Sequence, residues 1–199
     1  MAVETTKKTP KKKDTLRTFI CIEIPDSIKS RIDQLQSTLR TVDAQVSWTK
    51  SANIHLTLKF LGAVQASRIP RVCNAVERAA ADIERFKFEI SGTGCFPSAR
   101  SPRVLWIGLA KVPTQLQQLY DNIEDELTRE GFPREKRKFS PHLTIGRLRK
   151  PENCPRIANL LITTGFDAET VSAGSVIVMR SDLKPAGSIY TSQCVIDLN

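Results

Sequence analysis

The chain contains only two histidines, and both occupy the same local sequence. His55 begins the segment HLTLKFLG and His142 begins HLTIGRLRK, so each is followed by Leu, Thr and an aliphatic residue. A β-strand places alternate side chains on the same face. In a strand, His55 would share a face with Thr57, and His142 would share a face with Thr144. Each motif therefore predicts an imidazole and a hydroxyl close together on a polar face.

A cationic residue follows each of these pairs. Strict alternation predicts that Lys59 lies on the same face as His55. Arg147 falls off the alternation that starts at His142, so it reaches the polar face only if the strand bends or ends at Gly146. Two such strands facing each other across a cleft would supply two imidazoles, two hydroxyls, a lysine and an arginine.

This set of groups suits the cleavage of a phosphodiester. One imidazole can take a proton from the nucleophile while the other gives a proton to the leaving oxygen. An ordinary imidazole pKa of about 6.5 lets one ring be neutral and the other charged near neutral pH. Hydroxyls and cations can bind the non-bridging oxygens and the charge that develops on them. The motifs therefore predict phosphodiester chemistry that needs no metal or other cofactor.

Three other interpretations of the histidines stay open from spacing alone. A metal site is one, although no Asp or Glu lies within five residues of either histidine in the sequence, and threonine is a poor ligand for most metals. A purely structural role in two strands is another. A Ser-His-Asp hydrolase is the third, but the GxSxG signature of many such enzymes is missing from the sequence.

Composition narrows the class of protein. The chain has 199 residues, of which 40% are hydrophobic, and a formal net charge of +9. It contains no apolar run near the roughly 20 residues of a membrane span, and its first residues, MAVETTKKTPKKKDT, lack the apolar core of a signal peptide. We therefore expect a soluble cytoplasmic protein without a membrane partner. The basic charge favours a polyanion such as nucleic acid.

The five cysteines are widely spread and form no CxxC pair. Their odd number and spacing are typical of reduced, mostly buried thiols in a cytosolic protein. No cysteine lies near either histidine in the sequence, which argues against a zinc site.

Hydrophobic periodicity predicts alternating strands and helices. Strands are expected over residues 16–25, 45–50, 86–94, 102–110, 174–183 and 188–198 and at both histidine motifs, and helices after Pro25, around 67–86, from Pro113 to before Gly131, and around 157–162. Each half contains helices and one HLT strand, which predicts an α+β fold of two related lobes that face each other. We expect a disordered basic tail over residues 1–15 and a single two-lobed domain over 16–199.

The segments HLTLKFLG and SPHLTIGR resemble the paired HxTx motifs of the two-histidine (2H) phosphoesterase superfamily. Within it, the chain is most similar to the RNA 2′,3′-cyclic phosphodiesterase family, also called the 2′-5′ RNA ligase family. RTFICIEIP resembles the first strand of that family, FPSARSPRVLWIGL its central segment and VIVMRSDLKPAGSIYTS its last hairpin. The resemblance covers about residues 17–198.

The resemblance implies a bilobal α+β fold whose lobes each have an antiparallel sheet, with the two motifs on facing central strands. It implies metal-free hydrolysis of an RNA end, in which water opens a 2′,3′-cyclic phosphate and leaves a 2′-phosphate. His55 would then donate a proton to the leaving 3′-oxygen, His142 would activate water, and Thr57 and Thr144 would bind phosphate oxygens. We expect the protein to act as a monomer.

Two other functions remain open at this point. The same groups could run the reverse reaction and join the cyclic phosphate to a 5′-hydroxyl of a tRNA half, as a 2′-5′ RNA ligase. The basic cleft could also belong to a non-catalytic RNA-binding module. The sequence leaves it open whether Arg103, Arg180 or the basic loop at 134–138 contacts the substrate.

Overall fold

The computed structural model describes residues 14–150, 152–185 and 187–199. The predicted disordered tail, residues 1–15, lies outside this part of the chain except for its last two residues, and the first strand begins at Thr15. Within the described ranges, no helix is long and apolar enough to cross a membrane.

The described residues form nine strands and four α-helices. The strands are β1 (Thr15–Glu23), β2 (Val46–Trp48), β3 (His55–Gln65), β4 (Phe86–Phe96), β5 (Val104–Leu109), β6 (Leu143–Leu148), β7 (Glu169–Ala173), β8 (Ser175–Lys184) and β9 (Gly187–Asp197). The α-helices are α1 (Asp26–Leu39), α2 (Ile69–Ala80), α3 (Thr114–Arg129) and α4 (Cys154–Thr164), and short 3-10 turns cover Ser51–Asn53 and Ala66–Arg68.

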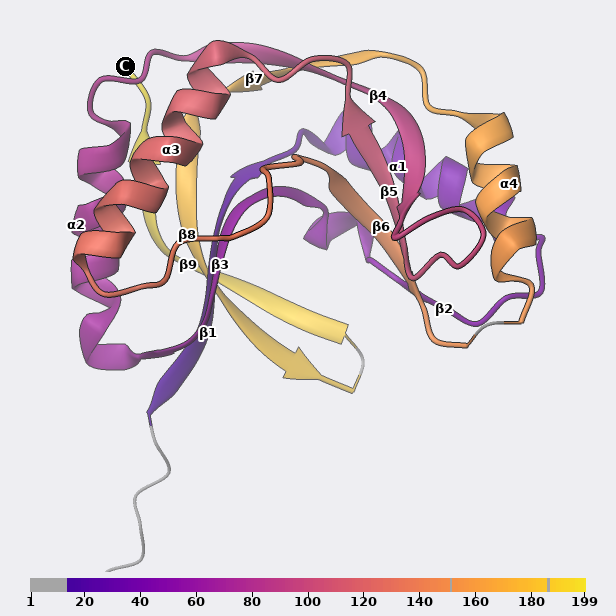
Figure 1. Cartoon of the computed structure of the whole chain (residues 1–199), viewed down its shortest axis with the longest axis horizontal. Helices are drawn as coiled ribbons and strands as arrows, with labels where there is room; N and C mark the ends of the chain where they lie inside the picture. The colour runs from indigo at the N-terminus through magenta and orange to yellow at the C-terminus, as the bar shows by residue number, and fades with distance from the viewer. Residues whose placement is uncertain (1–13, 151, 186) are drawn as a thin grey trace, which may run out of the picture.

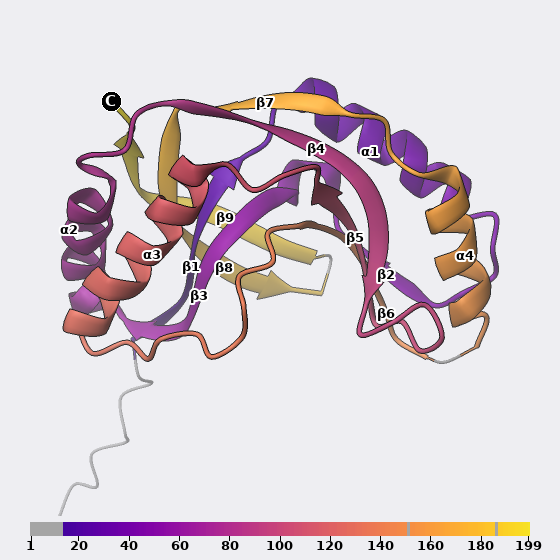
Figure 2. The ribbon, with the colours of Figure 1, turned by 45° about the horizontal axis from the view of Figure 1, so that its top comes forward.

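The strands form one antiparallel sheet in the order β7-β4-β5-β6-β3-β1-β8-β9, with β2 also paired to β6. We call β1, β3, β8 and β9 with α2 and α3 the first lobe, and β2, β4–β7 with α1 and α4 the second lobe; the two helix pairs lie at opposite ends of the molecule (Figures 1 and 2). A single residue pair, Leu56 with Leu143, joins β3 to β6 and hence one lobe to the other. The predicted two-lobed α+β fold is confirmed, with the lobes sharing one continuous sheet.

The helices follow the apolar periodicity of the sequence. In α1, for example, Ile28, Ile32, Leu35 and Leu39 recur at helical spacing and are all buried. Helix α3 starts directly after Pro113, which suits the start of a helix because its fixed φ is close to the helical value. The chain then turns at Gly131, whose φ of +82° is a conformation that glycine adopts without strain.

Two elements of the second lobe differ from the prediction. Helix α4 begins at Cys154 rather than near Ile157, because Pro155 is accommodated in its first turn. Strand β7 is absent from the predicted elements. It has five residues, and only Val171 and Ala173 point into the core, so the apolar alternation is too short to stand out.

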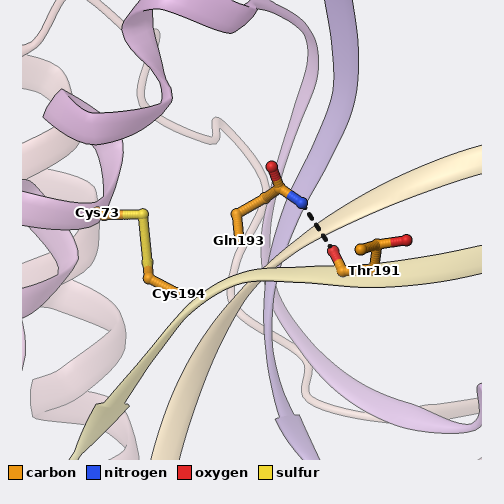
Figure 3. Close-up of a disulfide and its surroundings, with 4 residues drawn as sticks. All are labelled: Cys73, Thr191, Gln193 and Cys194. Atoms are coloured by element: carbon orange, nitrogen blue, oxygen red, sulfur yellow. Dashed lines mark hydrogen bonds between the residues drawn. A yellow bond between two sulfur atoms is a disulfide. The ribbon is translucent and has the colours of Figure 1, made fainter.

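Two of the five cysteines form a disulfide, which corrects the prediction that all of them are reduced. Cys73 on α2 bonds to Cys194 on β9, with a Cα–Cα distance of 6.3 Å (Figure 3). Next to it on β9, the side-chain amide of Gln193 donates to the backbone carbonyl of Thr191 at 3.1 Å. The bond fastens the strand at the edge of the first lobe to the helix that packs beside it. The other three cysteines, Cys21, Cys95 and Cys154, are free thiols.

Reduction of this disulfide is expected to destabilise the protein markedly. The two cysteines are 121 residues apart, and the bond therefore removes much of the conformational entropy of the unfolded chain, which corresponds to roughly 4–5 kcal/mol in the chain-entropy model. Denaturant unfolding with and without reductant measures the loss. The double variant Cys73→Ser/Cys194→Ser serves as the control, because reductant should leave its midpoint unchanged. An equal response of both proteins to reductant would contradict the prediction.

Candidate active site

The pairing of β3 with β6 brings the two histidine motifs together. Because the strands are antiparallel and Leu56 lies opposite Leu143, the register places His55 across from Thr144 and Thr57 across from His142. Leu56 and Leu143 are fully buried, so these four polar side chains lie on the opposite face of the sheet. The predicted imidazoles and hydroxyls thus alternate around one junction between the lobes.

Each motif strand contains a β-bulge directly after its threonine. On β3, Thr57 pairs with Cys21 but Lys59 already pairs with Ile20, so Leu58 is the additional residue. On β6, Thr144 pairs with Trp106 and Gly146 pairs with Leu105, so Ile145 is the additional residue. A bulge breaks the alternation of side chains by one position. The residue three positions after each threonine, Phe60 or Arg147, therefore returns to the polar face.

A cavity of about 280 Å³, which we call the histidine cavity, lies on this face. His55, Thr57 and Phe60 of β3 line it together with Thr144 and Arg147 of β6. The first strand contributes Arg17 and Phe19, the segments before β3 contribute Thr49 and Asn53, and the β8–β9 hairpin contributes Ser181, Leu183, Ser188 and Tyr190. Arg147 therefore enters the site, as predicted for a strand that departs from alternation near Gly146.

The sequence suggested that Gly146 lets the strand bend, but the structure shows that it also makes room for a neighbouring strand. A Cβ atom there would lie 2.8 Å from Val46 and 3.2 Å from Trp48, both on β2. The absence of a side chain allows β2 to pack closely against β6. Gln36 of α1 supports the same place, since its amide donates to the carbonyl oxygens of Thr49 at 2.8 Å and of the bulge residue Ile145 at 2.9 Å.

Aromatic side chains enclose His55. Its ring stacks on Phe19 with 4.6 Å between centroids, and the ring of Tyr190 approaches edge-on at 5.3 Å. Phe19 is 3% exposed, which makes it a rigid support. The side chain of Asn53 donates to the carbonyl of Ser188 at 2.8 Å and so joins the hairpin to the segment just before His55.

His142 lies just before β6 and is not among the residues that line the histidine cavity. Its ring contacts Phe96 edge-on at 5.0 Å and lies 6.4 Å from the ring of Trp106. The indole of Trp106 lies against Gly94, where a Cβ atom would be 2.3 Å from it. Both histidines are therefore held against aromatic rings of the neighbouring strands of their own lobe.

The two imidazoles are oriented in the same way. Nδ1 of His55 is 2.7 Å from the carbonyl oxygen of Asn53, and Nδ1 of His142 is 2.7 Å from the carbonyl oxygen of Ser140. A carbonyl oxygen only accepts, so Nδ1 carries the hydrogen in each ring. In the neutral ring, Nε2 is then the nitrogen that can take up a proton. The site offers two such Nε2 atoms fixed by backbone contacts.

Burial favours the neutral form of both rings. It lowers the pKa of His55 to about 4, with the nearby charge of Lys29 adding to the effect and the hydrogen bond to Asn53 opposing it. Burial also lowers the pKa of His142, with a smaller contribution from Arg147 in the same direction. In the ligand-free protein both imidazoles are bases at neutral pH.

The placement predicted for Lys59 is wrong. The bulge at Leu58 turns this side chain into the interior, where it is 6% exposed. Its Nζ donates to Glu124 Oε1 on α3 at 2.6 Å and to the carbonyl of Pro133 at 3.0 Å. Glu124 in turn accepts from the backbone N–H of Glu135 at 2.9 Å. Lys59 therefore holds α3 and the loop that leads to the second motif, and it does not line the histidine cavity.

The other basic residues left open by the sequence lie outside the histidine cavity. Arg180 pairs with Asp182 at 2.9 Å. In the loop 134–138, Arg134 pairs with Asp125 and Arg137 pairs with Glu135. Arg103 lines a separate cavity at the far end of β6.

The aromatic residues that line the histidine cavity were not predicted from the sequence, nor were the residues that the β8–β9 hairpin contributes to it. Arg17 and Phe19 were detectable in principle, since they alternate on the first strand and β1 pairs with the motif strand β3. Strict alternation places Phe60 on the opposite face from His55, and only the bulge at Leu58 brings it to the cavity. Tyr190 and Ser188 are far from both motifs in the sequence, and their presence depends on how the β8–β9 hairpin folds over the site.

A family model described as LigT-like phosphoesterase matches the chain twice, over residues 22–106 and 107–190. The chain belongs to this family. Each match contains one HLT motif, so the internal repeat of the sequence corresponds to two copies of the LigT-like unit. The two copies do not coincide with the two lobes, because strands from both halves of the chain enter each lobe.

Relatives match along nearly the whole chain. The RNA 2′,3′-cyclic phosphodiesterase of Methanothermobacter thermautotrophicus is 34% identical over 188 residues, which cover 92% of this chain and 99% of the relative. The protein of the same name from Thermotoga maritima is 32% identical and covers 88% of this chain and 91% of its own.

Solved structures share the fold. A protein of Thermus thermophilus superposes with a TM-score of 0.79 at 22% identity, covering 92% of this chain and 98% of its own. Escherichia coli LigT in complex with 3′-AMP superposes with a TM-score of 0.75 at 22% identity, covering 93% and 99%.

The buried Lys59–Glu124 pair of this LigT-like chain leads to a stability prediction. Lys59→Met would leave the Glu124 carboxylate buried without its cation, and we expect a loss of about 3–5 kcal/mol in the free energy of unfolding. Denaturant unfolding measures the loss.

The double variant Lys59→Met/Glu124→Leu removes both charges and should recover most of that stability, since an apolar pair of similar volume is tolerated in place of a buried ion pair. Arg78→Met, which breaks the exposed pairs of Arg78 with Glu126 and Glu130, is the matched control and should lower the free energy of unfolding far less than Lys59→Met does. Equal losses for Lys59→Met and Arg78→Met would contradict a buried, structurally important pair.

Proposed function

We propose that this protein is a metal-independent RNA 2′,3′-cyclic phosphodiesterase that hydrolyses a terminal cyclic phosphate to a 2′-phosphate. The observation that carries the proposal is the junction of β3 and β6, where two identically oriented imidazoles alternate with two threonine hydroxyls. The names of the LigT-like relatives support the substrate class. The family match supports phosphoester chemistry.

In this proposal His142 takes a proton from water through Nε2, and the water oxygen attacks phosphorus. The bond from phosphorus to the 3′-oxygen breaks, His55 donates a proton to that oxygen, and a 3′-hydroxyl and a 2′-phosphate result. Thr57 and Thr144 donate hydrogen bonds to the non-bridging oxygens. Arg147 compensates the negative charge that develops on the phosphate.

The low pKa of His55 fits a donor that acquires its proton together with the substrate. A pKa of about 4 means that about one ligand-free molecule in a thousand carries this proton at pH 7. A phosphate in the cavity places a negative charge next to the imidazole, which favours the charged ring. The substrate would thus convert a neutral His55 into the acid that the reaction needs.

The reverse reaction uses the same groups, so 2′-5′ ligation of tRNA halves remains the second candidate. Water at high concentration favours hydrolysis over ligation. A non-catalytic RNA-binding module has no need for two imidazoles with free Nε2 atoms, which makes it the weaker alternative.

Two further properties belong to the proposal. We propose that the protein acts as a monomer, because one chain supplies both histidines and both threonines. We also propose a cytoplasmic location, which an RNA substrate favours. The Cys73–Cys194 disulfide is the one observation that runs against this location, since most structural disulfides persist in oxidising compartments.

The activity itself is tested with an RNA oligonucleotide that ends in a 2′,3′-cyclic phosphate, incubated with the protein in EDTA. We expect a 2′-phosphate product. His55→Ala and His142→Ala should each lower kcat about 10²- to 10⁴-fold, the range of general acid or base catalysis. The double variant should lose less than the product of the two, because the pair acts as a unit.

His55→Ala and His142→Ala should keep wild-type thermal stability within a few degrees, which separates lost chemistry from lost folding. No hydrolysis by the folded wild-type protein would refute the proposal. Formation of a 2′-5′ junction with 5′-hydroxyl tRNA halves in place of hydrolysis would favour the ligase.

Ligand binding should raise the pKa of His55. With only two histidines in the chain, their imidazole proton resonances can be assigned from the single variant His142→Ala. We expect the pKa of His55 to rise from about 4 by at least one unit on saturation with a 2′-nucleotide product, because the bound anion stabilises the charged ring. By linkage, the contribution of His55 to product binding then grows as the pH falls through the raised pKa toward the free value of about 4. A pKa of His55 that stays constant on binding would contradict its role as the proton donor.

A further inference from the structure

A second cavity, of about 450 Å³, opens at the far end of β6. We call it the basic groove and define it by four cationic residues that line it, Arg100, Arg103, Arg149 and Lys150. They come from the loop before β5 and from the end of β6. The remaining described lining residues are Ser101, Pro102, Leu148, Cys154 and Pro155, so none of them is acidic.

The charges of the basic groove are not neutralised within the described part of the chain. None of its four cations takes part in an ion pair there, whereas Arg134 and Arg137 of the loop 134–138 both do. All four are exposed. Four like charges around one hollow repel each other in the free protein, and a bound polyanion relieves this repulsion. The N-terminus of α4, at Cys154 and Pro155, adds the positive end of a helix dipole to the same hollow.

The histidine cavity and the basic groove are both lined by residues of β6 and its end. Arg147 lines the histidine cavity and Arg149 lines the basic groove, two residues further along. Ser47 pairs with Arg147 across the strands, and the guanidinium of Arg149 donates to Ser47 Oγ at 3.1 Å. Both arginines therefore lie on the same face, about 7 Å apart along the strand. Cationic side chains thus lead from the proposed reaction centre to the basic groove.

We propose that the basic groove binds the phosphodiester backbone of the RNA strand that carries the reacting end. This inference rests on the proposed function, because the cyclic phosphate fixes the end of the strand in the histidine cavity. The next phosphates along the chain would then follow Arg147 and Arg149 into the groove. The contacts are to phosphates and carry no base preference. A cyclic mononucleotide fills only the histidine cavity.

The test compares the groove variant Arg103→Gln/Arg149→Gln with a charge-matched control, Lys87→Gln/Lys111→Gln. Lys87 and Lys111 are exposed and line neither cavity. The measured quantity is kcat/KM for a 12-nucleotide RNA with a 2′,3′-cyclic phosphate, divided by kcat/KM for a nucleoside 2′,3′-cyclic phosphate. We expect this ratio to fall about 10-fold or more in the groove variant and to stay within about 2-fold of wild type in the control.

Salt dependence gives a second readout. For single-stranded nucleic acid, the slope of log affinity against log salt changes by about 0.7 for each phosphate contact. Loss of two contacts should therefore make the slope of RNA binding shallower by about 1.4 in the groove variant, measured by fluorescence anisotropy. A second groove pair, Arg100→Gln/Lys150→Gln, should act in the same direction and covers the case in which the first pair misfolds.

Failure of the inference and failure of the proposed function give different results. An unchanged ratio and an unchanged salt slope in both groove variants, in an active enzyme, would overturn the groove as an RNA site. If the wild-type protein hydrolyses neither substrate, the proposed function fails. The anisotropy measurement still tests the groove in that case, because it needs no turnover: weaker RNA binding by the groove variants than by the control supports it, and equal binding overturns it.

Discussion

The two β-bulges that follow Thr57 and Thr144 determine what the active site contains. Each inserts one additional residue into a motif strand, so the side chain that rejoins the polar face is three positions after the threonine instead of two. On β3 this residue is Phe60, and on β6 it is Arg147. The same distortion in both strands keeps the four motif side chains related by an approximate twofold arrangement around the Leu56–Leu143 pair. It also makes the surroundings of that arrangement unequal, with an aromatic ring on one side and a cation on the other.

The bulge on β3 has a second consequence in the interior. It directs Lys59 inward, where an isolated ammonium group would be costly. Glu124 and the carbonyl of Pro133 satisfy the Lys59 ammonium group, and Glu124 also accepts from the backbone of Glu135. The loop before His142 is thereby attached to the strand that carries His55. A local irregularity in the first motif thus contributes to the position of the second.

The sequence was sufficient for the parts of this protein that depend on regular periodicity. Helical spacing in α1 and α3 and the strands that carry the HLT motifs were predictable. The meeting of the two motifs was predictable as well, because the only two histidines of the chain share the same tetrapeptide. Prediction failed where the periodicity breaks. Strict alternation placed Lys59 in the cleft because no residue near Leu58 signals a bulge. The pairing of Cys73 with Cys194 could not be read from spacing, since it depends on the packing of α2 against the last strand.

The near-symmetry of the two imidazoles raises the question of how they acquire opposite roles. Both hold the hydrogen on Nδ1 through a backbone carbonyl two residues earlier, so orientation does not distinguish them. Their surroundings do. His55 is packed between Phe19 and Tyr190, which makes its ring the more sensitive to any charge that enters the cavity. His142 lies beside Arg147, whose positive charge opposes its protonation. Lys29 has the same effect on His55, so the protein's own charges do not make either ring the acid. In the proposed reaction the phosphate therefore has to make the difference. A bound anion raises the pKa of the more deeply buried imidazole, His55, most strongly, because a charge acts most strongly where water is excluded.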